Sequence, residues 1–185
     1  MAFETRTEPV SHPWIDGKPY DAGGDRFEDL MSPWDGSLVA HVAMADAATI
    51  DAAVASSRKA FLANRHVTPA QRAQWLRDAG GEIDRIKERI ADVTMRALGK
   101  PRRACGFEVG RVSQLMQLCA EELLRMEGEV LPLDALAMGA GRFGFTRHHP
   151  HGVIAAFTPF NAPSNLLMQK LAPAIAMGNA VVIKP

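Results

Sequence analysis

Hydrophobic positions near the C-terminal end form two short apolar runs, separated by a segment with helical spacing. The runs, Val153 to Phe157 and Ala180 to Ile183, have the length and composition of buried strands. Apolar residues between them recur every three or four positions, and Gly178-Asn179 supplies a helix stop. The pattern predicts a βαβ unit with two parallel strands and a right-handed crossover.

Three helices are predicted upstream of this unit. The first runs from an N-cap at Asp46 to about Ala63, and the third runs from Pro101 to about Met126. The second starts at a capping box, Thr68-Pro69-Ala70-Gln71, and ends at Gly99. The faces expected to be buried are Ile50, Val54, Ser57 and Phe61 in the first helix, Trp75, Leu76, Ala79, Ile83, Ile86, Ile90 and Val93 in the second, and Cys105, Val109, Val112, Met116, Cys119 and Leu123 in the third.

The remaining segments have the pattern of short strands and turns. Asp16-Gly17 predicts a hairpin between Trp14 and Tyr20, and a turn at Ser32 to Gly36 leads into an apolar run from Ser37 to Ala43. Loose alternation from Arg142 to His149, after a turn-rich connection, predicts an exposed or half-buried strand. Residues 1–13 are expected to be mobile.

Charge and composition exclude several classes of partner. Lys plus Arg and Asp plus Glu both number 21, so the formal net charge of zero offers no basis for binding nucleic acid or an anionic membrane. The polar N-terminus lacks the pattern of a signal peptide. Gln169 and Lys170 interrupt the longest apolar stretch, which argues against a membrane span. A soluble, cytoplasmic protein is therefore expected.

The two cysteines, Cys105 and Cys119, lie on the apolar stripe of the third predicted helix. Two cysteines do not make a disulfide scaffold, and a reactive thiol needs an electropositive, partly exposed setting. We therefore interpret both as packing residues.

Residues 139–144, Gly-Ala-Gly-Arg-Phe-Gly, match the dinucleotide fingerprint G-x-G-x-x-G. That fingerprint holds a pyrophosphate only where a strand precedes it and a helix follows it. Here a loop precedes it and a β-type segment follows, so we interpret the match as a flexible turn into a strand.

Three histidines, His148, His149 and His151, cluster just before the first C-terminal strand. Metal-binding histidines usually come from an i, i+4 helix face or from separate elements, with carboxylate or thiol partners. A run interrupted by Pro150 offers neither, so we interpret these residues as polar positions at a strand end.

Two polar residues follow the ends of the predicted parallel strands. Asn161 is either a cap for the helix that starts near Pro163, or an amide donor at the ligand-binding edge of the sheet, where it could stabilise an oxyanion. Lys184 is either a solvated charge or a donor to a ribose hydroxyl or phosphate. Residue types alone leave both pairs of alternatives open.

A family resemblance is carried by residues 158–185, TPFNAPSNLLMQKLAPAIAMGNAVVIKP. This segment resembles the aldehyde dehydrogenase superfamily, whose members carry a Pro-aromatic-Asn-x-Pro turn, a Lys-Leu-Ala-Pro-Ala helix and a Gly-Asn-x-Val-Val-x-Lys-Pro strand. The Asp16-Gly17 hairpin, the segment Leu98 to Pro101 and Gly128-Glu129 agree in order upstream. The resemblance therefore covers nearly all of residues 14–185.

The resemblance implies an α/β fold with a helical N-terminal layer, the first βαβ unit of a Rossmann-like parallel sheet and part of an oligomerisation β-hairpin. Residues 14–141 would form the N-terminal hairpin and the helical part of the cofactor domain. Residues 142–150 would add a strand to the oligomerisation sheet, and 151–185 would be the truncated first βαβ of the cofactor domain. The full-length protein would be a homo-oligomer, either a dimer or a tetramer.

The resemblance also implies roles for individual residues. Asn161 would help to stabilise the oxyanion of a cysteine thiohemiacetal formed from a small aldehyde, and Lys184 would contact the adenosine ribose of NAD or NADP. The nicotinamide-ribose side of that cofactor would be lined by Phe157, Thr158, Pro159 and Phe160. Phe160 departs from the Trp that is commonest in the family and resembles members acting on small polar or phosphorylated aldehydes.

Three parts of the family's machinery have no match in this chain: the nucleophilic cysteine, the general-base glutamate and the glycine turn that meets the pyrophosphate. The chain therefore resembles an N-terminal fragment, expected to be inactive alone. Two functions are compatible with it: aldehyde oxidation by a longer protein, or a catalytically inactive truncated chain that acts as an interaction module. Within the enzymes, a relative that reduces an acyl-phosphate is a further alternative.

Overall fold

The C-terminal part of the molecule is built on the predicted βαβ unit. Strand β8 (Val153–Phe157), helix α4 (Pro163–Ala176) and strand β9 (Ala180–Lys184) follow one another. The two strands pair in parallel, from Val153 opposite Ala180 to Phe157 opposite Lys184. Gly178, with φ of 83°, turns the chain from α4 into β9. The expected strand-helix-strand unit is confirmed.

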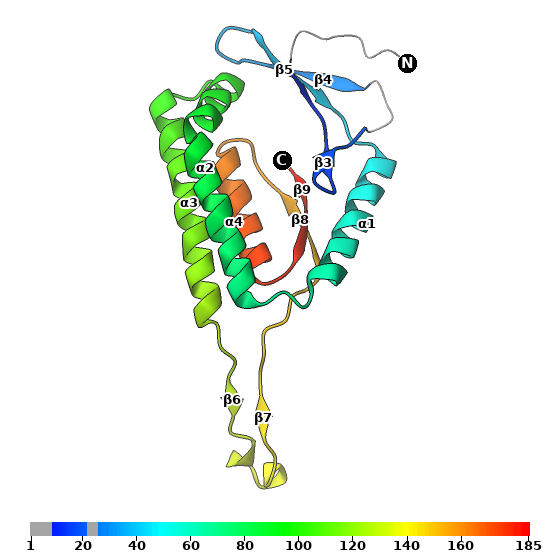
Figure 1. Cartoon of the computed structure of the whole chain (residues 1–185), viewed down its shortest axis with the longest axis vertical. Coiled ribbons are helices and arrows are strands. Elements are labelled where there is room, and N and C mark those ends of the chain that lie inside the picture. Colours follow the sequence, from blue (N-terminus) through cyan, green and yellow to red (C-terminus); the bar gives the residue numbers. More distant parts are fainter. Residues whose placement is uncertain (1–8, 22–25) are drawn as a thin grey trace.

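Helices flank the two strands on both sides. The computed structural model describes residues 9–21 and 26–185. Helix α1 (Ala47–Asn64) lies on one side of β8 and β9, whereas α2 (Pro69–Leu98) and α3 (Arg102–Arg125) lie on the other, with α4 next to the strands (Figure 1). This arrangement is the mixed α/β fold that the sequence predicted. Within the described ranges, no helix has both the length and the apolar composition of a membrane span.

The main hydrophobic core lies between α2, α3 and α4. Its buried members are Ala73, Leu76, Val112, Met116, Ala120, Leu123, Ala172 and Ala176. A second, smaller cluster joins Ala91 of α2 to Cys105 and Val109 of α3. The apolar stripe predicted for α3 is therefore confirmed.

The buried face of α2 is only partly the predicted one. Leu76 is buried as expected, but three large members of the predicted face are exposed: Trp75, Ile86 and Val93. Ala73 and Gly80 are buried instead. A Cβ on Gly80 would already be in van der Waals contact with Ser113, so α2 and α3 approach closely along small residues. Trp75, Ile86 and Val93 therefore lie outside the closest part of this contact.

Helix α1 begins at the predicted N-cap, where Asp46 Oδ1 accepts a hydrogen bond from the Thr49 N–H at 2.7 Å. The predicted inner face is partly wrong, because Ile50 and Val54 are exposed whereas Thr49 is buried. Phe61 does face inward and lies near Gly152, just before β8. The helix is rich in alanine, so few large side chains distinguish its inner face in the sequence.

A small sheet and a hairpin precede α1. Strands β1 (Val10–Ser11), β5 (Leu38–Ala43) and β4 (Phe27–Met31) form the sheet in that order, with β5 parallel to β1 and antiparallel to β4. The predicted hairpin joins β2 (Trp14–Ile15) to β3 (Lys18–Pro19). Its turn residues, Asp16 and Gly17, have φ of 57° and 74°, as a type I′ turn requires. Of the segment expected to be mobile, residues 1–8 lie outside the described residues.

A narrow hairpin projects from the body between α3 and β8 (Figure 1). Its elements are β6 (Val130–Leu131), two 3₁₀ turns (Leu133–Ala135 and Ala137–Gly139) and β7 (Gly144–Phe145). The strand predicted over Arg142 to His149 is thus much shorter than expected, because β6 pairs with only two of its residues. Residues 139–144 lead from a turn into β7, and the helix that a dinucleotide fingerprint needs does not follow them.

Candidate functional site

The carboxyl ends of β8 and β9 bring several of the predicted site residues together. Phe157 pairs with Lys184, and the Thr158 N–H donates to the main-chain oxygen of Lys184 at 3.1 Å. This hydrogen bond extends the strand pairing by one residue, after which the chain turns toward α4. Parallel sheets bind ligands at this edge.

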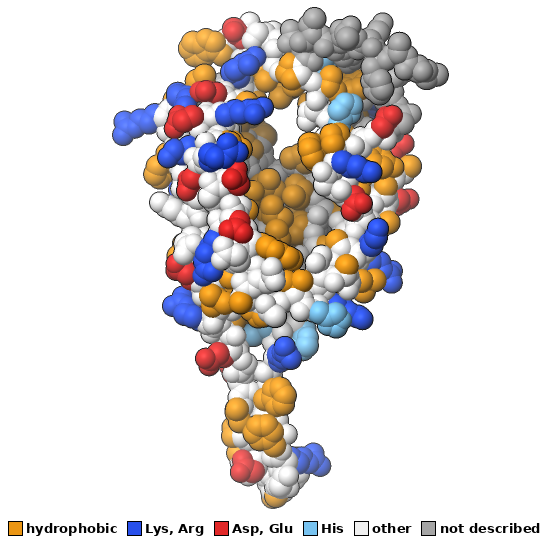
Figure 2. Space-filling view, in the orientation of Figure 1, with side chains coloured by type: hydrophobic (Ala, Val, Ile, Leu, Met, Phe, Trp, Pro, Cys, Tyr) orange, Lys and Arg blue, Asp and Glu red, His pale blue; other side chains and the backbone are white. Residues whose placement is uncertain are grey.

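Aromatic side chains at this edge are uncovered. Phe157 is 69% exposed and Phe160 is 80% exposed, and Pro159 between them is exposed as well. Figure 2 shows hydrophobic side chains gathered in a hollow between α1 and α2, where β8, β9 and α4 lie. An exposed apolar patch of this kind marks a surface for a ligand or for another part of a protein.

Lys184 stands at the open end of β9. Its side chain is exposed, and Nζ donates to the main-chain oxygen of Pro185 at 2.9 Å. Within the described residues, no acidic side chain forms an ion pair with it.

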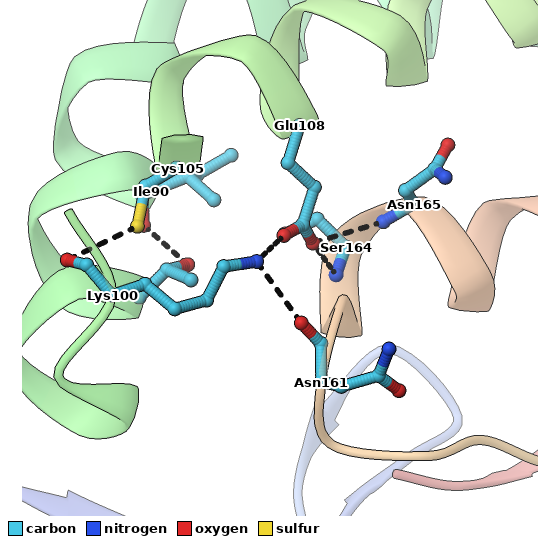
Figure 3. Close-up of polar contacts among 8 residues, drawn as sticks. Ile90, Lys100, Cys105, Glu108, Asn161, Ser164 and Asn165 are labelled. Atoms are coloured by element: carbon cyan, nitrogen blue, oxygen red, sulfur yellow. Dashed lines mark hydrogen bonds and ion pairs between the residues drawn. The ribbon is translucent and has the colours of Figure 1, made fainter. Parts of the chain in front are cut away.

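Helix α4 takes its N-terminal cap from another helix. Its own N-cap residue is Ala162, which has no side-chain acceptor, and Pro163 follows at N1. Glu108 of α3 supplies the acceptor: its Oε1 accepts from the N–H groups of Ser164 at 2.9 Å and Asn165 at 3.3 Å (Figure 3). A carboxylate at this position also complements the positive end of the helix dipole.

The second carboxylate oxygen of Glu108 binds Lys100. Lys100 Nζ lies 2.5 Å from Glu108 Oε2 and donates a further hydrogen bond to the main-chain oxygen of Asn161 at 3.0 Å (Figure 3). The Glu108 side chain is 6% exposed and that of Lys100 is 25% exposed, so the pair is largely shielded from water. Removal of one partner would leave the other charge poorly compensated.

Asn161 is not the helix cap. It precedes the N-cap residue Ala162, and Lys100 binds its main-chain oxygen rather than its side chain. The residue is exposed, and its carboxamide makes no hydrogen bond to any residue that the structure describes (Figure 3). Of the two sequence-based interpretations of Asn161, the structure rules out the cap.

Neither thiol is placed as a nucleophile. Cys105 is fully buried, with Sγ 3.9 Å from the main-chain oxygen of Lys100. Burial raises the pKa of the Cys119 thiol, which disfavours the thiolate that a nucleophile needs. The three histidines before β8 are exposed, and the described part of the chain holds no group of three or more side chains that could bind a metal ion.

Sequence reasoning did not single out Glu108. This residue lies on the same helical stripe as Cys105 and Val112, three positions after the first and four before the second. A carboxylate on an otherwise apolar stripe is rarely buried without a partner. The acidic residue on this apolar stripe is therefore a sequence signal for a buried, partnered carboxylate. It does not identify Lys100 or the start of α4 as the partners.

The sequence pattern of the aldehyde dehydrogenase family matches residues 20–185. The chain belongs to the aldehyde dehydrogenase family. A 3-sulfolactaldehyde dehydrogenase of Priestia megaterium is 34% identical to it over 157 residues, which are 85% of this chain and 32% of that protein.

Solved structures of aldehyde dehydrogenases have the same fold. Aldehyde dehydrogenase 21 from Physcomitrella patens, in complex with the reaction product succinate, matches with a TM-score of 0.91 at 31% identity, over 97% of this chain and 37% of that one. PnpE in complex with nicotinamide adenine dinucleotide matches with a TM-score of 0.87 at 34% identity, over 95% of this chain and 35% of that one. The chain thus spans about a third of the length of the family members that it matches.

Proposed function

We propose that these residues form part of the cofactor and oxyanion site of an NAD(P)-dependent aldehyde dehydrogenase, which oxidises an aldehyde to a carboxylic acid. The observation that carries this proposal is the Asn161 carboxamide, which makes no hydrogen bond within the described part of the chain and lies beside the carboxyl edge of a parallel βαβ unit. Glu108 caps α4, so a capping role does not explain why an asparagine stands at position 161. Family membership supports the same class of reaction.

Asn161 acts in this proposal as a hydrogen-bond donor to an oxyanion. When a cysteine thiolate adds to the aldehyde carbon, the carbonyl oxygen gains negative charge, and a carboxamide N–H pointing at it lowers the energy of that state. Loss of a hydride from this adduct to the nicotinamide of NAD(P)⁺ would leave a thioester, which water then hydrolyses to the carboxylic acid and the free thiol. The thiolate comes from a residue outside these 185, since Cys105 and Cys119 pack inside the helical layer.

The expected cofactor contacts suit a nicotinamide dinucleotide. Residues 157–160 (Phe157, Thr158, Pro159 and Phe160) would lie along the nicotinamide-ribose side, where exposed apolar side chains can cover a flat ring. Lys184 would donate to the oxygens of the adenosine ribose. Bound NAD(P)⁺ supplies the hydride acceptor of the reaction. The NAD complex of PnpE, whose fold this chain shares, supports this cofactor class.

The proposed substrate is a small polar aldehyde. Phe160, in place of the usual Trp, resembles family members that act on such aldehydes. The 3-sulfolactaldehyde dehydrogenase among the relatives is in keeping with this class, because its substrate carries an anionic group next to a short chain.

The test uses the full-length gene product, meaning the protein that the reading frame encodes around these residues. The purified protein is mixed with NAD⁺ or NADP⁺ and a set of small aldehydes, such as lactaldehyde and glyceraldehyde 3-phosphate, and formation of the reduced nicotinamide is followed by absorbance. We expect cofactor reduction that depends on the aldehyde. Absence of activity with every aldehyde contradicts the proposal and favours an interaction module, and reduction of an acyl-phosphate by NAD(P)H favours the alternative enzyme.

A further inference from the structure

The largely buried pair Lys100–Glu108 ties the beginning of α3 to a segment 56 to 61 residues later in the chain. Lys100 lies in the short link between α2 and α3, and Glu108 lies on α3. Lys100 contacts Asn161 on the turn from β8 into α4, and Glu108 contacts the first turn of α4 itself (Figure 3). One carboxylate thus serves two N–H groups of α4 and one ammonium group. The ammonium group in turn reaches the main chain of Asn161.

The contact to Asn161 is made through its backbone, which leaves the side chain available. A hydrogen bond from Lys100 to the main-chain oxygen restrains the position of the residue and the direction of its peptide plane. The two side-chain torsions of the carboxamide are not restrained by this bond. A catalytic donor is most effective when its supporting contacts hold it close to the productive geometry.

We infer that Lys100 and Glu108 are positioning residues for Asn161: they anchor the turn so that the carboxamide is presented to the reacting carbonyl oxygen. This inference rests on the proposed function, in which Asn161 donates to an oxyanion. Glu108 holds the start of α4 and orients the Lys100 ammonium group, and Lys100 passes this constraint to Asn161.

A purely structural role for the pair makes a different prediction, and the other end of α4 provides the control. Arg72 of α2 donates from Nε to the main-chain oxygen of Ala176 at 2.8 Å and from Nη1 to that of Val67 at 2.5 Å. It therefore holds the last turn of α4 without touching the Asn161 turn. If the network only stabilised α4, losing Arg72 or Lys100 should have similar effects on activity.

The experiment compares Lys100→Met, Glu108→Gln and Arg72→Met in the full-length gene product. Lys100→Met keeps an unbranched apolar side chain but removes the bond to Asn161, and Glu108→Gln keeps an acceptor for the α4 N–H groups but removes the charge that binds Lys100. We expect both to lower kcat about tenfold to a hundredfold, the range for a misplaced catalytic group, with the KM for the cofactor little changed. Arg72→Met should lower the melting temperature and leave kcat, measured well below that temperature, within about twofold.

A double-mutant comparison tests whether Lys100 acts through Asn161. In an Asn161→Ala background the donor is absent, so Lys100→Met should change kcat by no more than about twofold. An equal loss in both backgrounds, or an unchanged kcat in Lys100→Met alone, overturns the inference.

Hydrogen exchange of the backbone amides tests the anchoring of the turn without a measurement of enzyme activity. Peptides covering residues 158–166 should exchange faster in Lys100→Met and Glu108→Gln than in the wild type, and unchanged exchange also overturns the inference. If the wild-type protein oxidises no aldehyde, the proposed function fails. Faster exchange in that case still supports the anchoring of the turn.

Discussion

Glu108 and Arg72 bind the two opposite ends of helix α4. Glu108 accepts hydrogen bonds from its first N–H groups, and Arg72 donates to the main-chain oxygen of Ala176 in its last turn. A negative group at the N-terminus and a positive group at the C-terminus both complement the helix dipole. Because these residues belong to α3 and α2, the helical pair sets the position of α4 from both ends.

The first prediction concerns substitutions of Asn161 in the full-length gene product. Loss of one oxyanion donor typically costs about 2.7–4 kcal/mol, or roughly 10²–10³ in kcat, so Asn161→Ala should fall in this range. Asn161→Asp replaces the donor with a negative charge facing the developing one, and should be worse than Ala. Thermal stability should stay close to wild type in the Asp variant, because the residue is exposed and does not cap α4.

The measurement for Asn161 is kcat and melting temperature for the three proteins side by side. We expect kcat to fall in the order Asn, Ala, Asp, whereas the three melting temperatures should lie close together because residue 161 is exposed and does not cap α4. Activity that simply follows stability, with Asp near wild type, would remove Asn161 from the catalytic site.

The second prediction is that residues 1–185 alone have no aldehyde dehydrogenase activity. Their two thiols pack on α3, and burial raises the pKa of Cys119. Purified 1–185 should therefore give no reduced cofactor with aldehydes that the full-length gene product oxidises. Reduction that disappears in Cys105→Ala or Cys119→Ala would contradict this.

The third prediction is that residues 1–185 alone associate or fold poorly. In the described chain β8 and β9 pair only with each other, and Phe157 and Phe160 are largely exposed nearby. Unpaired strand edges and open apolar faces favour association. Sedimentation and thermal unfolding of 1–185, with the full-length gene product as the control, provide the measurement. A monomer with a sharp, cooperative transition would be the opposite result.

The fourth prediction concerns pH and the cap of α1. The Thr49 N–H and then the Thr49 hydroxyl hold the pKa of Asp46 below its ordinary value. In this case the folded state binds fewer protons than the unfolded state, so the contribution of the cap is complete above the ordinary pKa and is lost as the pH falls through the lowered one. The window therefore lies below about pH 4.

Asp46→Asn and Asp46→Ala separate the charge of the cap from its hydrogen bond. Asn caps as well as Asp, so the Asn variant should match the wild type at neutral pH and lose less stability on acidification, whereas Ala should be less stable at neutral pH. Melting temperatures at pH 7 and at about pH 3 test this in the full-length gene product. Identical acid sensitivity in all three proteins would show that Asp46 has no part in it.

Local signals predicted the elements of this fold well. The Thr68 cap of α2 accepts from the Gln71 N–H, and Gly99 closes the same helix with φ of 65°. Both features depend on residues within a few positions of each other, so spacing is enough to find them. The βαβ unit was recognisable for the same reason.

The contacts that shape the candidate site are not local. Glu108 caps a helix that begins 56 residues later in the chain, counted to Ser164. No short-range pattern identifies such a partner, and the sequence offered Asn161 as a possible cap of α4 instead. The inner face of α1 was only partly predicted for a different reason: small residues such as Thr49 line much of it, and the larger Ile50 and Val54 remain exposed.

Helix α1 packs on strands that the ribosome makes much later. Its partners, β8 and β9, begin at Val153, after both long helices and the projecting hairpin. The α2–α3 pair joins neighbours in sequence, so it can form while the chain is still being made. Most of the stability of a helix in a protein comes from tertiary packing of one face rather than from intrinsic helix propensity. During synthesis, α1 therefore lacks its main packing surface until β8 and β9 have emerged, and the closing of this side of the molecule is a late event in folding.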